Sequence, residues 1–389
     1  MSVIPEIAAL HDEMTSWRRD LHAHPELGFT ETRTARFIAE MLTDMGMPIH
    51  RGLGRTGVVG TLTTGPGPAI ALRAEMDALP IQETTRLSYK SIHAGCMHAC
   101  GHDGHTATLL GAARYLTATR NFSGTVHFVF QPAEEGLAGA RAMIDDGLFE
   151  KFPVEGVYSL HNNPLQRAGT FGSRVGPMMA ASANFDIVVK GRGMHSARPE
   201  NGVDAIVASA HLIGALQSIV SRNVSPHDTA VVSVTKIHAG TAYNIIPAEV
   251  LISGNVRTFR PEVSDTIQAA LSRIAKGTAE QFGAAVSVEF RPGYPPLVNH
   301  AREVAIAAAA AADVVGEENV DRDCQPFMAS EDFSYMLQAR PGAYMVIGNG
   351  DGADAVEVHN PGYDYNDALL PIGASYFARL VEMNLPKVH

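Results

Sequence analysis

Hydrophobic and polar positions follow two different periods along the first 180 residues. Apolar runs of strand length stand at 57–62, 69–73, 125–130 and 156–160. Amphipathic segments of helical length stand at 4–22, 32–45, 104–117 and 139–145. Strands that alternate with helices in this way are typical of an α/β domain whose sheet is mixed but largely parallel, with helices on both faces.

The pattern changes after residue 182. Strand, helix, strand, strand, helix and strand follow one another at 184–190, 203–222, 229–238, 249–257, 263–282 and 285–291. This β-α-β-β-α-β order predicts a ferredoxin-like α+β sandwich. Further α/β elements follow at 301–315, 343–348 and 370–383. We therefore expect one α/β domain built from 1–182 and 293–389, interrupted by an inserted domain at 183–292.

Composition and charge narrow the class of protein. The 389 residues are too many for one ordinary core, which agrees with two domains. A net charge of −11 argues against a nucleic-acid partner, and no apolar run is long enough to span a membrane. The charged segment 1–20 predicts an amphipathic helix and no signal peptide. Three cysteines without an export signal favour a cytoplasmic location and no disulfide framework.

The segment 97–105 concentrates groups that bind metals. It reads Met-His-Ala-Cys-Gly-His-Asp-Gly-His, and Asp77 lies just after the strand that precedes it. In an extended segment Cys100 and His102 point the same way, so they can share one ion or a pair of ions. Thiolate and imidazole suit Zn, Mn, Co or Ni. The alternative interpretation is a structural cysteine beside surface histidines.

Three further groups follow predicted strands or lie in a late loop. Glu134 and Glu135 come directly after an apolar strand, His161 ends the next strand, and His359 lies in a loop. Functional groups gather just past the carboxyl ends of parallel strands. Adjacent side chains point apart in extended backbone, so one glutamate can bind metal while the other faces water. A solvated helix N-terminus is the alternative for the glutamate pair.

Together these motifs resemble those of the M20 metallopeptidase family, in its amidohydrolase branch, which includes aminoacylases and hippurate hydrolases. The matching stretches cover nearly the whole chain in the same order: 17–26, 73–80, 97–105, 131–135, 195–204 and 359–367. The resemblance implies a zinc-peptidase-like catalytic domain that binds metal and an inserted domain that serves as lid and dimerisation domain. Glu75 departs from the pattern, because this branch usually has Asp there.

The resemblance also implies a role for each candidate residue. Two divalent ions would be bound by Cys100, His102, Glu135, His161 and His359. Cys100 would bridge them, at the position where other branches have Asp. Asp77 would orient a ligand, and Glu134 would be the general base. Chemistry supports these roles, because a pair of divalent metal ions polarises a carbonyl group and lowers the pKa of bound water to roughly 7. An unligated glutamate can then move the proton to the leaving amine.

Three residues of the inserted domain match further positions of the family. His195 would reach the active site of a neighbouring subunit and stabilise the oxyanion, which implies a homodimer, with a tetramer as the alternative. Asn244 and Arg257 would hold the carboxylate of the substrate, for which the planar guanidinium of Arg is suited. The alternatives are an exposed loop histidine for His195 and a strand-surface salt bridge for Arg257.

The expected activity is therefore dinuclear, metal-dependent hydrolysis of the amide of N-acetyl or N-benzoyl amino acids. The products would be a carboxylic acid and a free amino acid. A di- or tripeptidase of the same fold is an alternative, and a non-catalytic metal- or ligand-binding protein is an alternative from another class. The sequence leaves open the acyl group, the amino acid, its stereochemistry and the native metal.

Overall fold

The computed structural model describes residues 2–350 and 355–387, which form two compact units. The first unit contains the chain up to Met178, Val298–Gln325 and the chain from Asp332 onward. The inserted unit contains Met179–Leu297 and the short segment Pro326–Glu331. The hydropathy pattern does not indicate this short segment, because it forms no helix or strand of its own. Independent folding of the predicted domains, divided at 183 and 292, stays a prediction.

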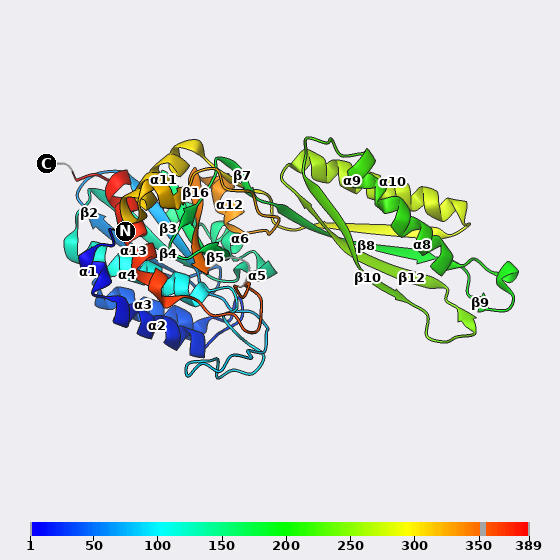
Figure 1. Cartoon of the computed structure of the whole chain (residues 1–389), viewed down its shortest axis with the longest axis horizontal. Coiled ribbons are helices and arrows are strands. Elements are labelled where there is room, and N and C mark those ends of the chain that lie inside the picture. Colours follow the sequence, from blue (N-terminus) through cyan, green and yellow to red (C-terminus); the bar gives the residue numbers. More distant parts are fainter. Residues whose placement is uncertain (1, 351–354, 388–389) are drawn as a thin grey trace. The chain divides into compact units, whose positions relative to one another are not determined.

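The first unit is built on an eight-stranded sheet with the order β1-β2-β4-β3-β5-β16-β6-β15. Figure 1 labels its strands β2, β3, β4, β5 and β16. The strands are β1 (Ile49–Leu53), β2 (Gly57–Thr64), β3 (Ala69–Glu75), β4 (Gly124–Gln131), β5 (Gly156–Arg167), β6 (Phe171–Gly172), β15 (Val320–Asp321) and β16 (Gly342–Gly350). The neighbouring pairs β4–β3, β3–β5, β5–β16 and β6–β15 are parallel. The pairs β1–β2, β2–β4 and β6–β16 are antiparallel. The sheet is thus mixed and largely parallel, as predicted.

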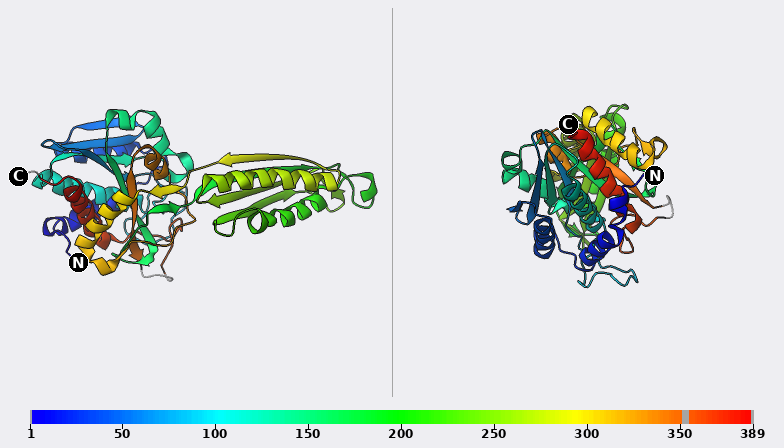
Figure 2. Two further views of the ribbon diagram at one scale, coloured as in Figure 1. Left: turned by 90° about the horizontal axis from the view of Figure 1, so that it is seen from above. Right: turned by 90° about the vertical axis from the view of Figure 1, so that its left-hand side faces the viewer.

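Helices cover this sheet. They are α1 (Pro5–Ala8), α2 (His11–Ala23), α3 (Thr32–Asp44), α4 (His102–Thr119), α5 (Glu134–Leu137), α6 (Gly139–Asp145), α7 (Leu148–Lys151), α11 (Ala301–Val315), α12 (Phe333–Ala339) and α13 (Leu370–Asn384). Figure 2 shows α13, in red, beside α11, in yellow-orange, and these helices are in contact. Nearly every position of β3 and β4 is buried, whichever face it points to. Burial on both faces explains why these central strands read as continuous apolar runs.

Three differences from the predicted elements have local causes. The segment expected as one helix at 4–22 is broken at Ala9 and Leu10 into α1 and α2. Strand β1 was not predicted, because most of its positions are exposed and carry no apolar alternation. Strand β5 continues seven residues beyond the predicted end at 160, since it stays paired with β16 as far as Arg167.

The inserted unit has the predicted ferredoxin-like order. Its main elements are β8 (Ala181–Lys190), α8 (Ala205–Leu216), α9 (Ser218–Arg222), β10 (Ala230–Ala239), β12 (Glu249–Thr258), α10 (Pro261–Gln281) and β13 (Ala285–Pro292). The strands form an antiparallel sheet with the order β10-β12-β8-β13. Side chains of β12 alternate strictly in burial, and the buried face packs against α8 and α10. The predicted helix at 203–222 is divided at Gln217 into α8 and α9.

The described residues also form two short strand pairs and three 3-10 turns. Strand β9 (Met194–His195) pairs with β11 (Ile245–Ile246), and β7 (Gly176–Met179) pairs with β14 (Leu297–Asn299). Three 3-10 turns lie at Pro199–Asn201, Glu317–Asn319 and Asp367–Leu369. Among the helices of the described residues, none combines the length and the apolar character that a membrane crossing needs.

Candidate metal centre

The carboxyl ends of β3 and β4 and the middle of the neighbouring parallel strand β5 position the candidate site. Strand β3 ends at Glu75, two residues before Asp77, and β4 ends three residues before Glu134. His161 lies within β5, at the register of Val346 on β16. Since these strands run in parallel, their groups meet at one edge of the sheet. The N-terminus of α4, which carries His102, lies at the same edge, where the Thr106 hydroxyl donates to the Glu75 carbonyl oxygen.

Two groups of potential ligands share the thiol of Cys100. Ligand atoms of Cys100, His102 and His161 lie within 4.8 Å of one another, and so do those of Cys100, Glu135 and His359. The Sγ of Cys100 is 3.5 Å from Nε2 of His161. Nε2 of His359 is 3.2 Å from Oε1 of Glu135. The structure thus brings together all five side chains that the sequence suggests as ligands, with Cys100 common to both groups.

Neighbouring oxygen atoms orient the imidazoles of His102, which is buried, and His161, which is partly buried, toward the thiol. Nδ1 of His102 is 3.0 Å from the backbone oxygen of Asp77 and 3.2 Å from its Oδ1. Nδ1 of His161 is 2.8 Å from the backbone oxygen of Asn162. Oxygen acceptors at Nδ1 require a proton there, which leaves Nε2 as the atom with a lone pair. Nε2 of His102 is buried and has no hydrogen-bond partner among the described residues, as expected for a nitrogen that binds a metal.

His359 reaches the site from a strained position in a loop. Its φ is 64°, in the left-handed region that residues other than glycine rarely adopt. The backbone N–H of His359 donates to the carbonyl oxygen of Ala99 over 2.7 Å. This bond joins the loop to the segment that carries Cys100. Local strain of this kind persists where the surrounding structure fixes it, which is common at functional sites.

The charges at the centre call for a cation. Burial and the carboxylates of Glu135, Glu134 and Glu75 hold the pKa of the Cys100 thiol well above its ordinary value. Burial by itself lowers the pKa of His102, but the carboxylates of Asp77, Glu75 and Glu135 together outweigh it and raise this pKa to about 10. A divalent ion would supply the positive charge that these groups favour, and it would hold the thiol as a thiolate. The donor set of sulfur, nitrogen and carboxylate oxygen therefore fits transition metals.

A buried network of charged residues lies behind the ligands, and its extent was not predicted. The Arg73 guanidinium contacts Glu75 and donates to Asp332 over 3.0 Å. The other oxygen of Glu75 is 2.9 Å from Nδ1 of His105, whose ring centroid lies 4.5 Å from that of His161. The resemblance to the family left His105 outside the ligand set. One signal in the sequence could have revealed the network, namely an arginine in the middle of the apolar strand at 69–74.

Glu134 is buried beside the ligands in a turn with unusual backbone angles. It is 8% exposed, and one of its oxygens lies within 4.8 Å of ligand atoms of His102 and Glu135. Its Oε1 accepts the backbone N–H of Asp332 over 3.3 Å. The backbone N–H of Glu135 donates to Oδ2 of Asp77 over 3.0 Å. Asp77 therefore contacts both His102 and the turn that holds the two glutamates.

The three candidate residues of the inserted unit do not lie together. His195 is exposed on β9, and the N–H of Ser196 beside it donates to the backbone oxygen of Asn244. Arg257 is half-buried near the opposite end of β12, where Nη1 donates to the Ser330 hydroxyl over 3.0 Å. Eight residues of extended strand separate Arg257 from Glu249, which corresponds to roughly 26 Å. Asn244 lies beside β9, which follows the end of β8 that pairs with Glu249. Asn244 and Arg257 therefore lie near opposite ends of β12.

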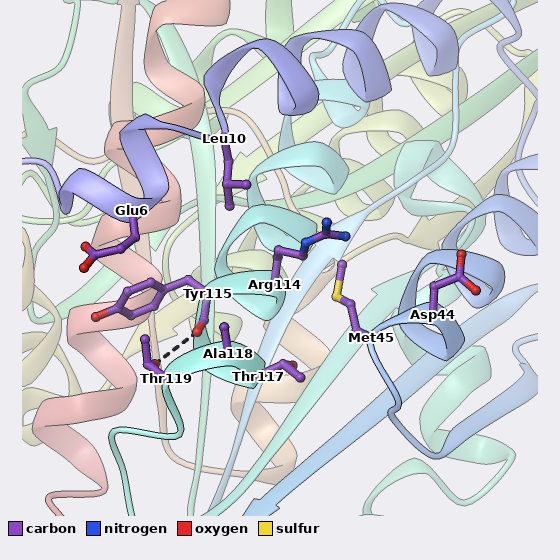
Figure 3. A pocket seen from close by; sticks show the side chains of 9 residues that line it. All are labelled: Glu6, Leu10, Asp44, Met45, Arg114, Tyr115, Thr117, Ala118 and Thr119. Carbon is purple, nitrogen blue, oxygen red and sulfur yellow. Dashed lines mark hydrogen bonds between the residues drawn. The ribbon is translucent and has the colours of Figure 1, made fainter.

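An open groove elsewhere on the first unit lies away from the candidate ligands. It has a volume of about 420 Å³ and is bordered by side chains from α1, α3 and the last turns of α4 (Figure 3). Its lining includes Leu10, Met45 and Tyr115. His102 begins α4, whose 18 residues span roughly 27 Å. The groove therefore lies about one helix length from the candidate ligands.

Comparisons with known proteins agree with this geometry. The profile of peptidase family M20/M25/M40 matches residues 71–383. The chain is 44% identical over 381 residues to a hippurate hydrolase of Campylobacter jejuni, and the match covers 98% of both chains. It is 39% identical to an N-acetylcysteine deacetylase of Bacillus subtilis, over 98% of this chain and 99% of that protein.

A solved structure shows the same similarity. A protein of Bacillus subtilis, described as a dinuclear metal-binding peptidase of the M20 family, superposes with a TM-score of 0.84. The two chains share 35% sequence identity, and the superposition covers 98% of this chain and all of the other.

Proposed function

Because the chain belongs to peptidase family M20/M25/M40, we propose that it is a metal-dependent amidohydrolase that cleaves N-acyl amino acids into a carboxylic acid and a free amino acid. The relatives support this substrate class, since the two most similar ones reported above are named for hydrolysis of hippurate and deacetylation of N-acetylcysteine. N-acetyl and N-benzoyl amino acids are therefore the first substrates to test.

The observation that carries the proposal is the position of Cys100 in both ligand groups. With His102 and His161 on one side and Glu135 and His359 on the other, a shared thiolate can serve two ions at once. These five residues would hold the pair, and Asp77 would fix the tautomer and direction of His102. Zn, Mn, Co and Ni all suit this donor set. When bound, such ions polarise a carbonyl oxygen and lower the pKa of water.

Glu134 is the proposed general base. It lies beside His102 and Glu135, and we propose that its carboxylate stays unligated and therefore available for proton transfer. The N–H of Asp332 holds its Oε1 in place. Glu134 would take the proton of the attacking water and deliver it to the nitrogen of the departing amine. A carboxylate fixed in this way needs little reorganisation during the reaction.

The separation of Arg257 from His195 and Asn244 supports a homodimer. We propose that Arg257 binds the substrate carboxylate, because the guanidinium offers two parallel hydrogen bonds. His195 and Asn244, which lie side by side, would act together at the active site of the neighbouring subunit. His195 would stabilise the oxyanion there. The dimer would form through the inserted unit, and a cytoplasmic location remains part of the proposal.

A substrate panel tests the proposed function. Purified protein with added Mn, Zn, Co or Ni should hydrolyse N-acetyl-Met or hippurate faster than Gly-Leu or Ala-Ala. Faster turnover of the peptides would instead identify a di- or tripeptidase. An absence of turnover with either class, in protein that contains two ions per chain, would contradict the amidohydrolase proposal and favour a binding protein.

A further inference from the structure

The turn that carries Glu134 has an unfavourable backbone conformation. Ala133, directly before Glu134, has φ 54° and ψ 42°, and Ala138 has φ 60° and ψ 48°. Both residues thus adopt the left-handed conformation, which costs free energy in any residue with a Cβ. Glu135 departs from helical angles as well, with ψ 77°. Contacts from outside the turn must therefore hold it in this shape.

Glu31 provides one of these contacts from a distant part of the chain. Its Oε1 accepts the backbone N–H of Ala133 over 2.9 Å, and its Oε2 accepts the hydroxyl of Thr56 over 2.7 Å. Glu31 precedes the first residue of α3, and Thr56 lies in the turn between β1 and β2. The carboxylate thus joins the start of a helix and a hairpin turn to the residue next to Glu134.

A role in stabilising the start of α3 does not explain why the side chain of Glu31 is buried. The backbone N–H groups at the start of α3 donate to another carboxylate, that of Glu26. It accepts from the N–H of Arg33 over 3.0 Å and from the N–H of Thr34 over 2.8 Å. The carboxylate of Glu31 instead binds Ala133 and Thr56, and Glu31 has no exposed surface. A buried carboxylate is costly unless it is well hydrogen-bonded. The hydrogen bonds of the Glu31 carboxylate therefore stabilise the turn that begins at Ala133.

We infer that Glu31 is a positioning residue, which holds the strained turn so that Glu134 points toward the metal centre. The inference rests on the proposed role of Glu134 in proton transfer. Glu31 does not touch the candidate ligands, so its effect passes through the backbone of Ala133. The opposite side of the turn is held by Asp77, which accepts the N–H of Glu135, and by Asp332, which donates to Glu134. Glu31 holds the first residue of the turn, Ala133, through its backbone N–H.

The test compares Glu31→Ala, Glu31→Gln and the matched control Glu26→Ala. Glu31→Ala should lower kcat for hippurate or N-acetyl-Met by about 10- to 100-fold, because small displacements of a reacting group are costly. KM and the metal content should stay near the wild-type values. Glu31→Gln should restore most of kcat, since its amide oxygen still accepts from Ala133. Glu26→Ala should lower the thermal midpoint without this fall in kcat.

Hydrogen exchange gives a readout that is independent of activity. Peptides that contain Ala133 should exchange faster in Glu31→Ala than in wild type or Glu26→Ala. If Glu31→Ala does not fold, Thr56→Val, which removes one bond to the carboxylate, should show the same effects more weakly. An unchanged kcat, a loss of metal, or a loss of activity no greater than that of Glu26→Ala would overturn the inference. Failure of the wild type on acyl amino acids would overturn the proposed function instead, and the exchange result would still test the contact.

Discussion

The Sγ of Cys100 lies 3.5 Å from Nε2 of His161, although 61 residues separate them in the chain. Cys100 comes just before α4, whereas His161 belongs to β5. The parallel sheet produces this contact, because it places the end of one strand and the start of the following helix beside the neighbouring strands. The same thiol also lies near Glu135 and His359. Cys100 is therefore the residue on which a two-metal site depends most.

Replacing Cys100 tests its bridging role. Cys100→Ala should reduce the metal content from two ions per chain to one or fewer, because both ligand groups lose a member. Cys100→Asp should retain two ions, since a carboxylate can also bridge. Elemental analysis of the purified variants measures this content. Cys96→Ala is the control and should bind as the wild type does. Two ions in Cys100→Ala would exclude a bridging thiolate.

Replacing Glu134 separates catalysis from binding. Glu134→Gln keeps the shape of the side chain but cannot accept a proton in the same way. We expect kcat to fall by roughly 10²- to 10⁴-fold, the usual contribution of general acid–base catalysis. Elemental analysis should find the wild-type metal content. Near-normal turnover in this variant would refute the role of Glu134 as the base.

A buried arginine should matter for stability. Arg18 is fully buried, 2.8 Å from Asp364, 2.6 Å from Asp367 and 3.8 Å from Asp103. Arg18→Met should destabilise the fold by about 3–5 kcal/mol, because it removes a buried cation that three carboxylates share. Urea unfolding measures the change.

The neighbouring residue is a matched control for Arg18. Arg19 also contacts Asp367, over 2.8 Å, but its side chain is 45% exposed. Arg19→Met should cost at most about 1 kcal/mol, as is usual for exposed ion pairs. An equal decrease in the free energy of unfolding of both variants would show that burial of Arg18 does not determine its contribution to stability.

Much of the fold and the centre of the site could be predicted from the sequence. Apolar runs identified β3 and β4 because both faces of these strands are buried. The five suggested ligands come together because they follow strand ends or lie in loops beside them. The role of Glu31 could not be predicted, since a pattern of residue types does not show which charged side chain is buried. For Arg73 the one signal is its place in an apolar strand. The placement of Arg257 away from Asn244 depends on strand length and register, which the motifs do not contain.

The pH dependence of stability should reveal the burial of Glu31. Burial raises its pKa from 4.5 to about 7, although hydrogen bonds from Thr56 and Ala133 oppose the increase. The neutral carboxyl is favoured in the fold, so its stabilisation is present below pH 4.5 and is lost as pH rises through about 7. Glu31→Gln stays neutral throughout.

The free energy of unfolding of Glu31→Gln, relative to wild type, should therefore increase as the pH rises from about 4.5 to about 7. The increase in the pKa of Glu31 from 4.5 to about 7 corresponds to a change of roughly 3 kcal/mol in this free-energy difference. Urea unfolding of both proteins at several pH values measures the difference, in which the titration of all other groups cancels. A difference that does not change with pH would show that Glu31 is not held in a strongly desolvating environment.

Anomalous diffraction from crystals soaked in Mn or Zn tests the central claim most directly, because it locates bound ions and their ligands together. The account predicts two adjacent peaks, one bound by His102 and His161 and the other by Glu135 and His359, with the Sγ of Cys100 between them. A single peak, or peaks bound by other side chains in crystals of active protein, would contradict it.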